Sequence, residues 1–288
     1  MKTLKFTGLG TSWAILIDED STPKTLEEEI GNQISTFEKK YSRFLPDSEL
    51  SQINQSPNNV QVSSDLKKML EIGLELHKAT DGFFDLNIAS LISGLGYDQN
   101  YSFTANQSLV NKPRGHFSLH DNTLIREGNV QIDLGSIGKG FLIDQIAHHL
   151  REQGIHHYLV DGGGDIFCSQ KRDNSPWSVA LEHPLHQEQA VAVIPLRNQG
   201  IATSSPQKRR FNDSHHLLNP KANSSTSTIL SVTTLASSAT FADVTATAIF
   251  VSPKQYWSPL SKITKVEYYA TDPNFSQLFS EKFPDLSF

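Results

Sequence analysis

The sequence predicts an α+β fold, with helices packed on a mixed or antiparallel sheet. Strand patterns dominate after residue 155, and the regular alternation of strands and helices that a doubly wound parallel sheet requires is not seen. Helical periodicity is confined to four segments. No Pro/Ser-rich linker, repeat or low-complexity tract divides the 288 residues, and a chain of this length can bury a sizeable core. We therefore expect residues 1–288 to form one large domain with sub-lobes.

A strand over residues 13–18 is the first expected element, and a turn at Pro23 follows it. The next element is an amphipathic helix, because apolar side chains then recur every three or four residues. They are Leu26, Ile30, Ile34, Phe37 and Tyr41. A second helix is expected to start after Ser63 or Ser64 as its N-cap and to stop near Gly82. Its apolar positions are Leu66, Met69, Leu70 and Leu76.

A buried strand over residues 130–132 is expected to run into a glycine-rich loop, and a third helix begins inside that loop and ends at Gly154. This helix is expected to bury Phe141, Leu142, Ile146 and Leu150. Most of the remaining chain has strand character, and a fourth helix covers residues 242–250. The expected strands are residues 158–160, 177–181, 191–195, 200–203 and 229–235.

Composition excludes several classes of function. The net charge is −6 and the 25 basic residues are scattered, which argues against a nucleic-acid-binding surface. The only basic run, residues 208–210, is either a solvated loop or a contact for a phosphate or an acidic partner. The single cysteine, Cys168, excludes an internal disulfide and a thiol cluster, and it is expected to be a small buried residue. No apolar run approaches the length of a membrane span.

The glycine-rich loop over residues 133–141 reads D-L-G-S-I-G-K-G-F. Glycines let backbone N–H groups approach a phosphate closely, and the N-terminus of the following helix adds a favourable dipole. The spacing matches neither the Walker loop nor the dinucleotide-binding fingerprint. The loop is therefore either an anion site of another kind or a tight turn between a strand and a helix.

Asp243 and Thr247 are four residues apart in the fourth helix, which places their side chains on one face. Two interpretations stay open. Asp243 caps the N-terminus of the helix, with Thr247 bonded back to the helix. Alternatively, the carboxylate is buried and needs a partner charge or a bound cation.

Several further segments repeat a recognisable order of motifs. After residues 158–166, where a strand ends in a glycine turn between Asp161 and Asp165, come residues 201–205 (I-A-T-S-S), 215–220 (H-H-L-L-N-P) and 242–248 (A-D-V-T-A-T-A). Residues 8–13, 42–50 and 80–85 match as well. Together with the glycine loop, these segments resemble the FAD:protein FMN transferases of the ApbE type over roughly residues 8–251. The resemblance implies an ApbE-like, T-fold-like α+β domain.

The resemblance also implies an activity. Such enzymes use Mg²⁺ to transfer FMN from FAD to a Ser or Thr hydroxyl of an acceptor flavoprotein, and they release AMP. In this chain the implied metal ligands are Asp243, Thr247 and the backbone carbonyl of Gly138, which are the hard oxygen donors that Mg²⁺ prefers. Two alternatives remain: an FAD pyrophosphatase that yields FMN and AMP, and a non-catalytic FAD-binding protein.

Further site residues follow from the resemblance. His216 would relay the proton from the attacking hydroxyl, the alternative being a histidine that only orders its loop. Phe44, Phe83 and Phe84 are equally compatible with a plain core, whereas Asp85 needs a partner wherever it lies. The implied FAD contacts are Leu9, Phe44, Phe83, Phe84, Asp85, Gly135, Phe141 and Leu218.

The chain departs from the family pattern at a few positions. Asn219 stands where the family has Asp, which removes a negative charge near His216, and Asn87 stands where it has Thr. Ser136 and Gly138 replace a Gly and an Ala, which are mild changes. Many relatives are exported, but residues 1–7 do not form a signal peptide, so we expect a cytoplasmic protein, or a periplasmic one if a leader was removed.

Overall fold

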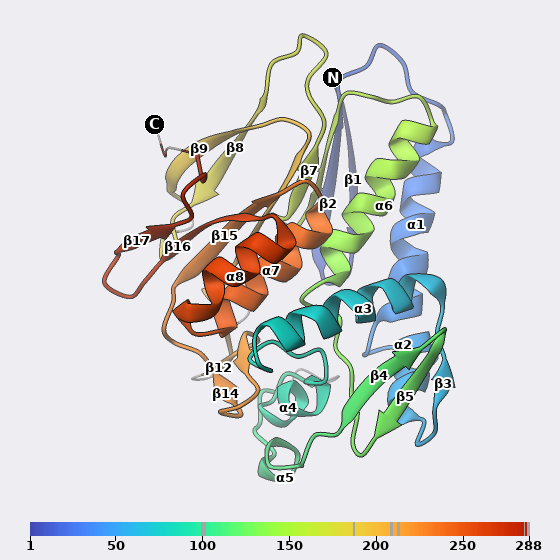
Figure 1. Ribbon diagram of the computed structural model, residues 1–288. Coiled ribbons are helices and arrows are strands. Elements are labelled where there is room, and N and C mark those ends of the chain that lie inside the picture. Colours follow the sequence, from blue (N-terminus) through green and yellow to red (C-terminus); the bar gives the residue numbers. More distant parts are fainter. Residues whose placement is uncertain (99–101, 187, 208–209, 212–213, 285, 287–288) are drawn as a thin grey trace.

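The computed structural model describes residues 1–98, 102–186, 188–207, 210–211, 214–284 and 286, and it has the α+β architecture predicted from the sequence (Figure 1). Its centre is an eight-stranded sheet in the order β1-β2-β6-β7-β10-β15-β16-β17, with every neighbouring pair antiparallel. The strands are β1 (Lys2–Gly8), β2 (Thr11–Ile17), β6 (Tyr158–Gly162), β7 (Ile166–Cys168), β10 (Gln199–Ser204), β15 (Ser231–Ala236), β16 (Glu267–Thr271) and β17 (Gln277–Phe279).

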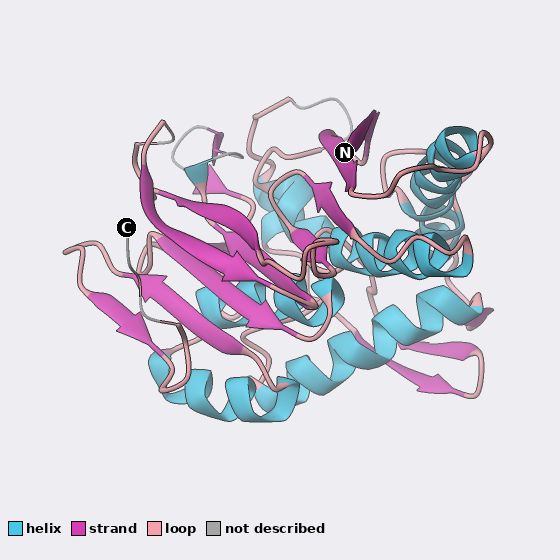
Figure 2. Cartoon of the chain, turned by 90° about the horizontal axis from the view of Figure 1, so that it is seen from above, coloured by secondary structure: helices cyan, strands magenta, loops and turns pink. Residues whose placement is uncertain are grey.

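Helices cover one face of this sheet (Figures 1 and 2). Apolar side chains of these helices and of β2, β6 and β15 form the main core, which includes Ile15, Val160 and Val232. The covering helices are α1 (Leu26–Tyr41), α6 (Gly138–Glu152), α7 (Ala239–Val251) and α8 (Trp257–Thr264), the last preceded by a 3₁₀ turn, Lys254–Tyr256. Among the described residues, none of the helices combines the length and apolar character that crossing a membrane requires.

A smaller lobe packs below these helices in Figure 1. It contains α2 (Glu49–Gln55), α3 (Ser64–Ala79), α4 (Ala89–Gly94), α5 (Gln107–Val110) and a small sheet of β3 (Val60–Gln61), β5 (Thr123–Glu127) and β4 (His116–His120). Four short strands lie near the site: β11 (Arg210–Phe211), β12 (Ser214–His215), β13 (Leu218–Asn219) and β14 (Ser224–Ser225).

The other face of the large sheet carries a hairpin of β8 (Trp177–Glu182) and β9 (Ala190–Leu196). A second apolar core fills the space between the hairpin and the sheet, so the molecule has three layers: hairpin, sheet and helices. Cys168 lies in this core, as expected for a small buried residue, and burial raises the pKa of its thiol to about 12. The hairpin contributes Trp177, Leu181, Ala192, Ile194 and Leu196 to this core.

The four predicted helices and the strands predicted after residue 155 are confirmed, with ends that differ by a few residues. The strand expected over residues 130–132 is wrong. The segment is buried, but side chains rather than a neighbouring strand satisfy its backbone: Asn54 both accepts from the N–H of Ile132 (2.7 Å) and donates to its carbonyl (2.8 Å). The N–H of Gln131 donates to Asn87 Oδ1 (2.7 Å). Burial alone therefore gave this segment the appearance of a strand.

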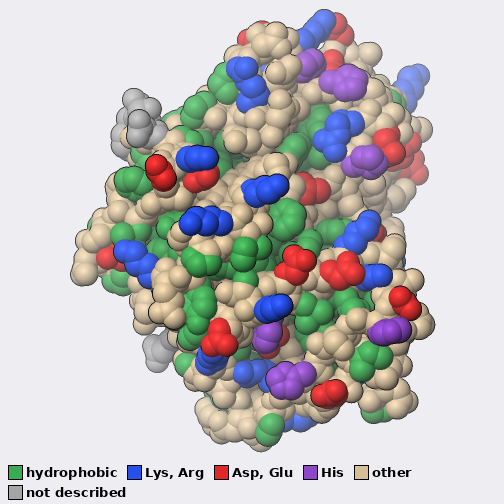
Figure 3. All heavy atoms as spheres, in the orientation of Figure 1, with side chains coloured by type: hydrophobic (Ala, Val, Ile, Leu, Met, Phe, Trp, Pro, Cys, Tyr) green, Lys and Arg blue, Asp and Glu red, His purple; other side chains and the backbone are tan. Residues whose placement is uncertain are grey.

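The surface shown in Figure 3 carries Lys and Arg side chains interspersed with Asp and Glu, and apolar side chains between them. This mixed pattern agrees with the scattered charge of the sequence. It provides no single-sign field on this face that would steer a polyanion.

Candidate active site

A cavity of about 1280 Å³ gathers nearly all of the predicted site residues. Its walls come from the smaller lobe, the glycine loop, the strand ends of the large sheet, α7 and β8. Phe141 is the one predicted residue that does not line the cavity: it is half-buried rather than buried, and its ring packs against that of Phe37 at 6.3 Å. The lining residues among those predicted are Leu9, Phe44, Phe83, Phe84, Asp85, Gly135, Gly138, His216, Leu218, Asp243 and Thr247.

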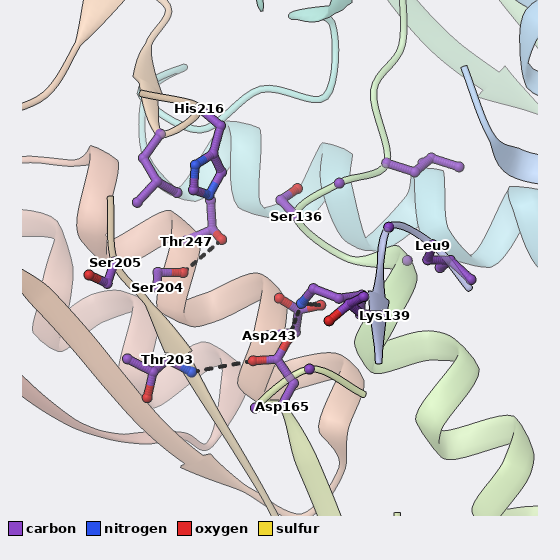
Figure 4. Close-up of a pocket in the computed structure, with 18 of the residues that line it drawn as sticks. Leu9, Ser136, Lys139, Asp165, Thr203, Ser204, Ser205, His216, Asp243 and Thr247 are labelled. Atoms are coloured by element: carbon purple, nitrogen blue, oxygen red, sulfur yellow. Dashed lines mark hydrogen bonds and ion pairs between the residues drawn. The ribbon is translucent and has the colours of Figure 1, made fainter. Parts of the chain in front are cut away.

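A buried cluster of opposite charges lies at the start of α6 (Figure 4). Asp243, on α7, is only 5% exposed, and its Oδ2 accepts a hydrogen bond from the N–H of Gly140 (3.0 Å). The Lys139 ammonium lies 3.5 Å from the same oxygen and also contacts the buried carboxylate of Asp165. Burial raises the pKa of Asp243 to about 7, opposed by the charge of Lys139 and reinforced by Asp165.

The structure excludes Asp243 as the cap of its helix. Ser238 is the N-cap, and its hydroxyl accepts from the N–H of Phe241 (3.2 Å). Asp144, on α6, accepts from the N–H groups of Ala239 and Thr240 (both 2.9 Å). Because the helix N-terminus is already satisfied, the buried carboxylate of Asp243 serves another purpose, and cations are the partners that stabilise it.

Thr247 lies one turn after Asp243 and faces the end of β10 (Figure 4). Its hydroxyl shares a hydrogen bond with Ser204 (3.0 Å), and β10 also brings the N–H of Thr203 to Asp165 (3.4 Å). No group of three or more His, Cys, Asp and Glu side chains is poised to hold a metal among the described residues. The available donors are the buried carboxylates of Asp243 and Asp165, hydroxyls and backbone oxygens, which suit a hard cation that takes further oxygens from a phosphate. Magnesium fits this set.

The two histidines of the H-H-L-L-N-P segment have different places. His215 is buried: its Nε2 donates to the carbonyl of Thr226 (2.7 Å) and its Nδ1 accepts from the N–H of Leu217 (3.2 Å). Burial lowers its pKa below the ordinary histidine value. His215 therefore helps to order this loop, while His216 lines the cavity and its imidazole points towards Thr247 (Figure 4). The proton-relay role of His216 stays a prediction.

The predicted aromatic contacts differ in exposure. Phe84 is 2% exposed and part of the main core, as the plain reading of the sequence allowed. Phe83 is half-buried, with the Lys221 ammonium 4.5 Å from its ring centre. Asp85 has the partners that its position demands, because its Oδ1 accepts from the N–H of Asn87 (2.8 Å) and lies 3.7 Å from His77 Nδ1. Their contact with FAD stays a prediction.

Arg43 is a cavity residue to which the sequence analysis gave no role. Its Nε lies 2.6 Å from Asp133 Oδ2, its other nitrogens donate to Ser93 Oγ (3.1 Å) and to the carbonyl of Tyr97 (2.8 Å), and its guanidinium stacks 4.2 Å from the ring centre of Phe44. Asp133 in turn accepts from the N–H of Gly135 (2.7 Å). One arginine thus connects the predicted flavin contact to the glycine loop.

Lys139 and Asp165 were also given no role, although both stand in the quoted motifs. The available signal was the pair of carboxylates around the glycine turn after β6, together with a lysine inside the glycine loop. Their contact joins segments 26 residues apart in the sequence, and only the packing of α6 against the sheet brings them together. A carboxylate this well buried requires such a partner.

Comparison with known proteins gives a consistent result. The sequence profile of the ApbE family matches residues 9–270. The chain is 27% identical over 280 residues to the FAD:protein FMN transferase of Vibrio cholerae serotype O1, covering 90% of this chain and 84% of that protein. It is 29% identical over 270 residues to the FAD:protein FMN transferase of Haemophilus influenzae, covering 84% and 78%.

Solved structures agree. The structure of the flavin transferase ApbE from Vibrio cholerae matches with a TM-score of 0.85 at 25% identity, covering 98% of this chain and 97% of the other. The apbe protein from Thermotoga maritima matches with a TM-score of 0.86 at 24% identity and the same coverage, a likeness of fold.

Proposed function

The chain belongs to the ApbE family, and we propose that it transfers FMN from FAD to a Ser or Thr hydroxyl of an acceptor flavoprotein and releases AMP. The observation that carries the proposal is the convergence of three features on one cavity: the glycine loop at the start of α6, the Asp243–Thr247 pair on α7, and the imidazole of His216. The relatives named FAD:protein FMN transferase support it.

The start of α6 would bind the diphosphate of FAD. The dipole of a helix favours an anion at its N-terminus. Mg²⁺ would be held by Asp243, Thr247 and the carbonyl of Gly138, and when bound it stabilises negative charge on the phosphoryl oxygens. Lys139 adds a second positive charge at the same place.

The reaction that we propose is a displacement at phosphorus. The hydroxyl oxygen of the acceptor forms a bond to the FMN phosphorus, the bond from that phosphorus to the bridging oxygen breaks, and AMP leaves with that oxygen. His216 takes the proton of the attacking hydroxyl, which suits a neutral imidazole near pH 7. Positioning supplies most of the remaining rate enhancement.

Asn219 keeps part of what the family's Asp would provide. Its Oδ1 accepts from the N–H groups of Lys221 (2.9 Å) and Ala222 (3.3 Å), so the turn after β13 is held as a carboxylate would hold it. Only the negative charge is lost. The turn that follows His216 is therefore ordered in this chain, which favours a catalytic protein over a non-catalytic FAD-binding protein.

The products distinguish this proposal from its alternatives. The chain is incubated with FAD, MgCl₂ and a candidate acceptor flavoprotein, and the intact mass of the acceptor is measured together with released AMP. An acceptor that gains the mass of FMN, with AMP in equal amount, is the expected result. AMP with free FMN would indicate an FAD pyrophosphatase, and no AMP would indicate a binding protein.

A further inference from the structure

The cavity continues from the catalytic residues along strand β8. Seven consecutive residues, 178–184, line it. Successive side chains of a strand point to opposite faces, so a cavity that touches only one face would be lined by every second residue. An uninterrupted run means that the cavity follows the backbone edge of β8.

Among the described residues, no strand other than β9 pairs with β8 at Ser178 and Ala180. β8 and β9 form a two-stranded sheet, and Ser178 lies opposite Pro195. Proline has no N–H, so this is a non-hydrogen-bonded pair, and the N–H and C=O groups of Ser178 and of Ala180 point away from β9. The bond from the N–H of His183 to the carbonyl of Gln189 (2.8 Å) agrees with this register. In the part of the chain that the structure describes, no segment bonds to the backbone of Ser178 or Ala180.

The two outer edges of this hairpin are not equivalent. Pro195 lies on the outer edge of β9, where a missing N–H interrupts any further pairing, and such prolines protect an edge strand. The outer edge of β8, from Trp177 to Glu182, contains no proline. The two outer edges thus differ in two respects. The edge of β9 is interrupted by a proline, whereas the edge of β8 has no proline and lies along the cavity.

The floor beside the open edge is apolar. Leu16, Leu159 and Ile166, from β2, β6 and β7, line the same cavity on the face of the large sheet that carries the hairpin. A row of backbone donors and acceptors next to an apolar floor is what strand addition requires: main-chain hydrogen bonds hold the peptide, and alternate side chains reach the floor.

We propose that an extended segment of the acceptor protein binds along β8 as a third strand of the β8–β9 sheet. This inference rests on the proposed function, because transfer to a protein requires a polypeptide whose hydroxyl reaches the cavity that holds His216 and Thr247. An extended segment can enter a cavity that a folded surface cannot. The edge of β8 is continuous with the catalytic residues through a single cavity and supplies the hydrogen bonds that such a segment needs.

Two proline substitutions at directly opposite residues test the docking site. Ala180→Pro removes an N–H from the open edge, and Val193→Pro, opposite Ala180 in the register, removes one from the edge already interrupted by Pro195. Neither N–H bonds across the hairpin, so both variants should fold. The probe is the acceptor protein that gains the FMN mass in the experiment above, and kcat/KM for that acceptor is measured at saturating FAD. We expect Ala180→Pro to lower it at least about tenfold, with FAD affinity unchanged, and Val193→Pro to leave both unchanged.

If Ala180→Pro does not fold, Ser178→Pro is used in its place, because the N–H of Ser178 points to the same outer edge of β8 as that of Ala180. Wild-type transfer rates in both β8 variants, or an equal loss in Val193→Pro, would overturn the docking site while the transferase proposal stands. A wild-type chain that releases AMP without modifying any protein would remove both. If light scattering shows that the β8 variants abolish a dimer and transfer is unchanged, the edge pairs with a second copy of the chain instead.

Discussion

At the scale of single residues, the buried carboxylate of Asp243 is the feature of α7 that requires a chemical explanation. Asp243 is buried next to Lys139, although the N-terminus of its helix is capped by Ser238. Retaining an ionised carboxylate in such a place costs stability. The cost makes sense if the site exists to bind a cation together with a phosphate.

Asp243→Asn should therefore lower AMP release about a hundredfold or more, because the proposed metal site would lose its only charged ligand. The variant keeps an acceptor for the N–H of Gly140, so the fold should persist. Thr247→Val should have a smaller effect. Thr245→Val is the matched control, since the hydroxyl of this fully buried neighbour has no hydrogen-bond partner among the described residues. Steady-state AMP release at several Mg²⁺ concentrations measures the effects, and an unchanged Asp243→Asn would refute the metal site.

The adjacent histidines should separate chemistry from stability. His216→Asn should slow AMP release about a hundredfold or more with little change in FAD affinity, because a proton relay acts on the transition state. His215→Gln should instead lower the free energy of unfolding, since His215 bonds to Thr226 and Leu217. Denaturant unfolding and AMP release are measured on both variants. If both variants lost stability and AMP release to the same extent, neither role would be assigned correctly.

His215 also gives the protein a pH dependence of stability. Its folded pKa is lowered by burial, so below the ordinary value of 6.5 the unfolded chain takes up a proton that the folded protein does not. The free energy of unfolding should thus fall as the pH drops below 6.5, by about 1.4 kcal/mol per pH unit at most from this residue. His215→Gln should remove this contribution. Unfolding of both proteins between pH 7.5 and 5.5 checks the difference in slope.

At the scale of elements, the close approach of α6 and α7 builds the site. A Cβ added to Gly140 would lie 2.4 Å from the carbonyl oxygen of Ala239, whereas one added to Gly138 would meet nothing nearer than Phe37 Cε1 at 3.6 Å. Gly140 therefore sets the distance between the two helices, whereas a side chain at Gly138 would not touch α7.

Gly140→Ala should therefore destabilise the protein by about 1–3 kcal/mol, because the backbone of α7 must move. FAD affinity should fall with it, since Asp243 moves too. Gly138→Ala should be neutral or slightly stabilising, because the new methyl group has room and alanine favours a helix. Urea unfolding and FAD titration of the two variants provide the comparison. Equal effects would show that the helix contact is not what places Asp243.

The sequence predicted where helices and strands form better than it predicted which segments contact one another. α6 was predictable because its apolar residues are periodic and the glycines mark where it begins, whereas α7 is buried on nearly all sides and shows no such periodicity. The strand expected over residues 130–132 failed, because the side chains of Asn54 and Asn87 replace a neighbouring strand, and no local pattern reveals that. For the same reason the contact between Arg43 and Asp133, 90 residues apart, was not predicted.

At the scale of the whole molecule, the large sheet connects both ends of the site. β2, from the N-terminal part of the chain, pairs with β6 from its middle. β7 joins β6 to β10, and β10 pairs with β15, so the later motifs lie on the same sheet. Alternating apolar residues predicted strands but could not show that β8 and β9 form a separate layer. The twelve residues predicted from motifs nevertheless converge on one cavity, Phe141 excepted, since motif order follows the order of the strand ends.

Because residues from position 9 to position 251 line the cavity, a ligand that fills it should stabilise the whole fold. FAD should bind more tightly than FMN in the presence of Mg²⁺, because the proposed site of the glycine loop, Lys139 and Asp243 would address a diphosphate and FMN has a single phosphate. A ligand at a hundred times its Kd contributes about 2.7 kcal/mol to the free energy of unfolding, which corresponds to a rise of roughly 4–5 °C in Tm for a chain of this size. We expect such a rise with FAD and Mg²⁺ and a clearly smaller one with FMN at the same concentration.

Thermal melts with a matched flavin fluorescence titration test this, with Asp243→Asn as the control in which the Mg²⁺-dependent part of the rise disappears. Equal affinities for FAD and FMN would mean that the cavity recognises the isoalloxazine alone, and the assignment of the glycine loop to a diphosphate would then be wrong.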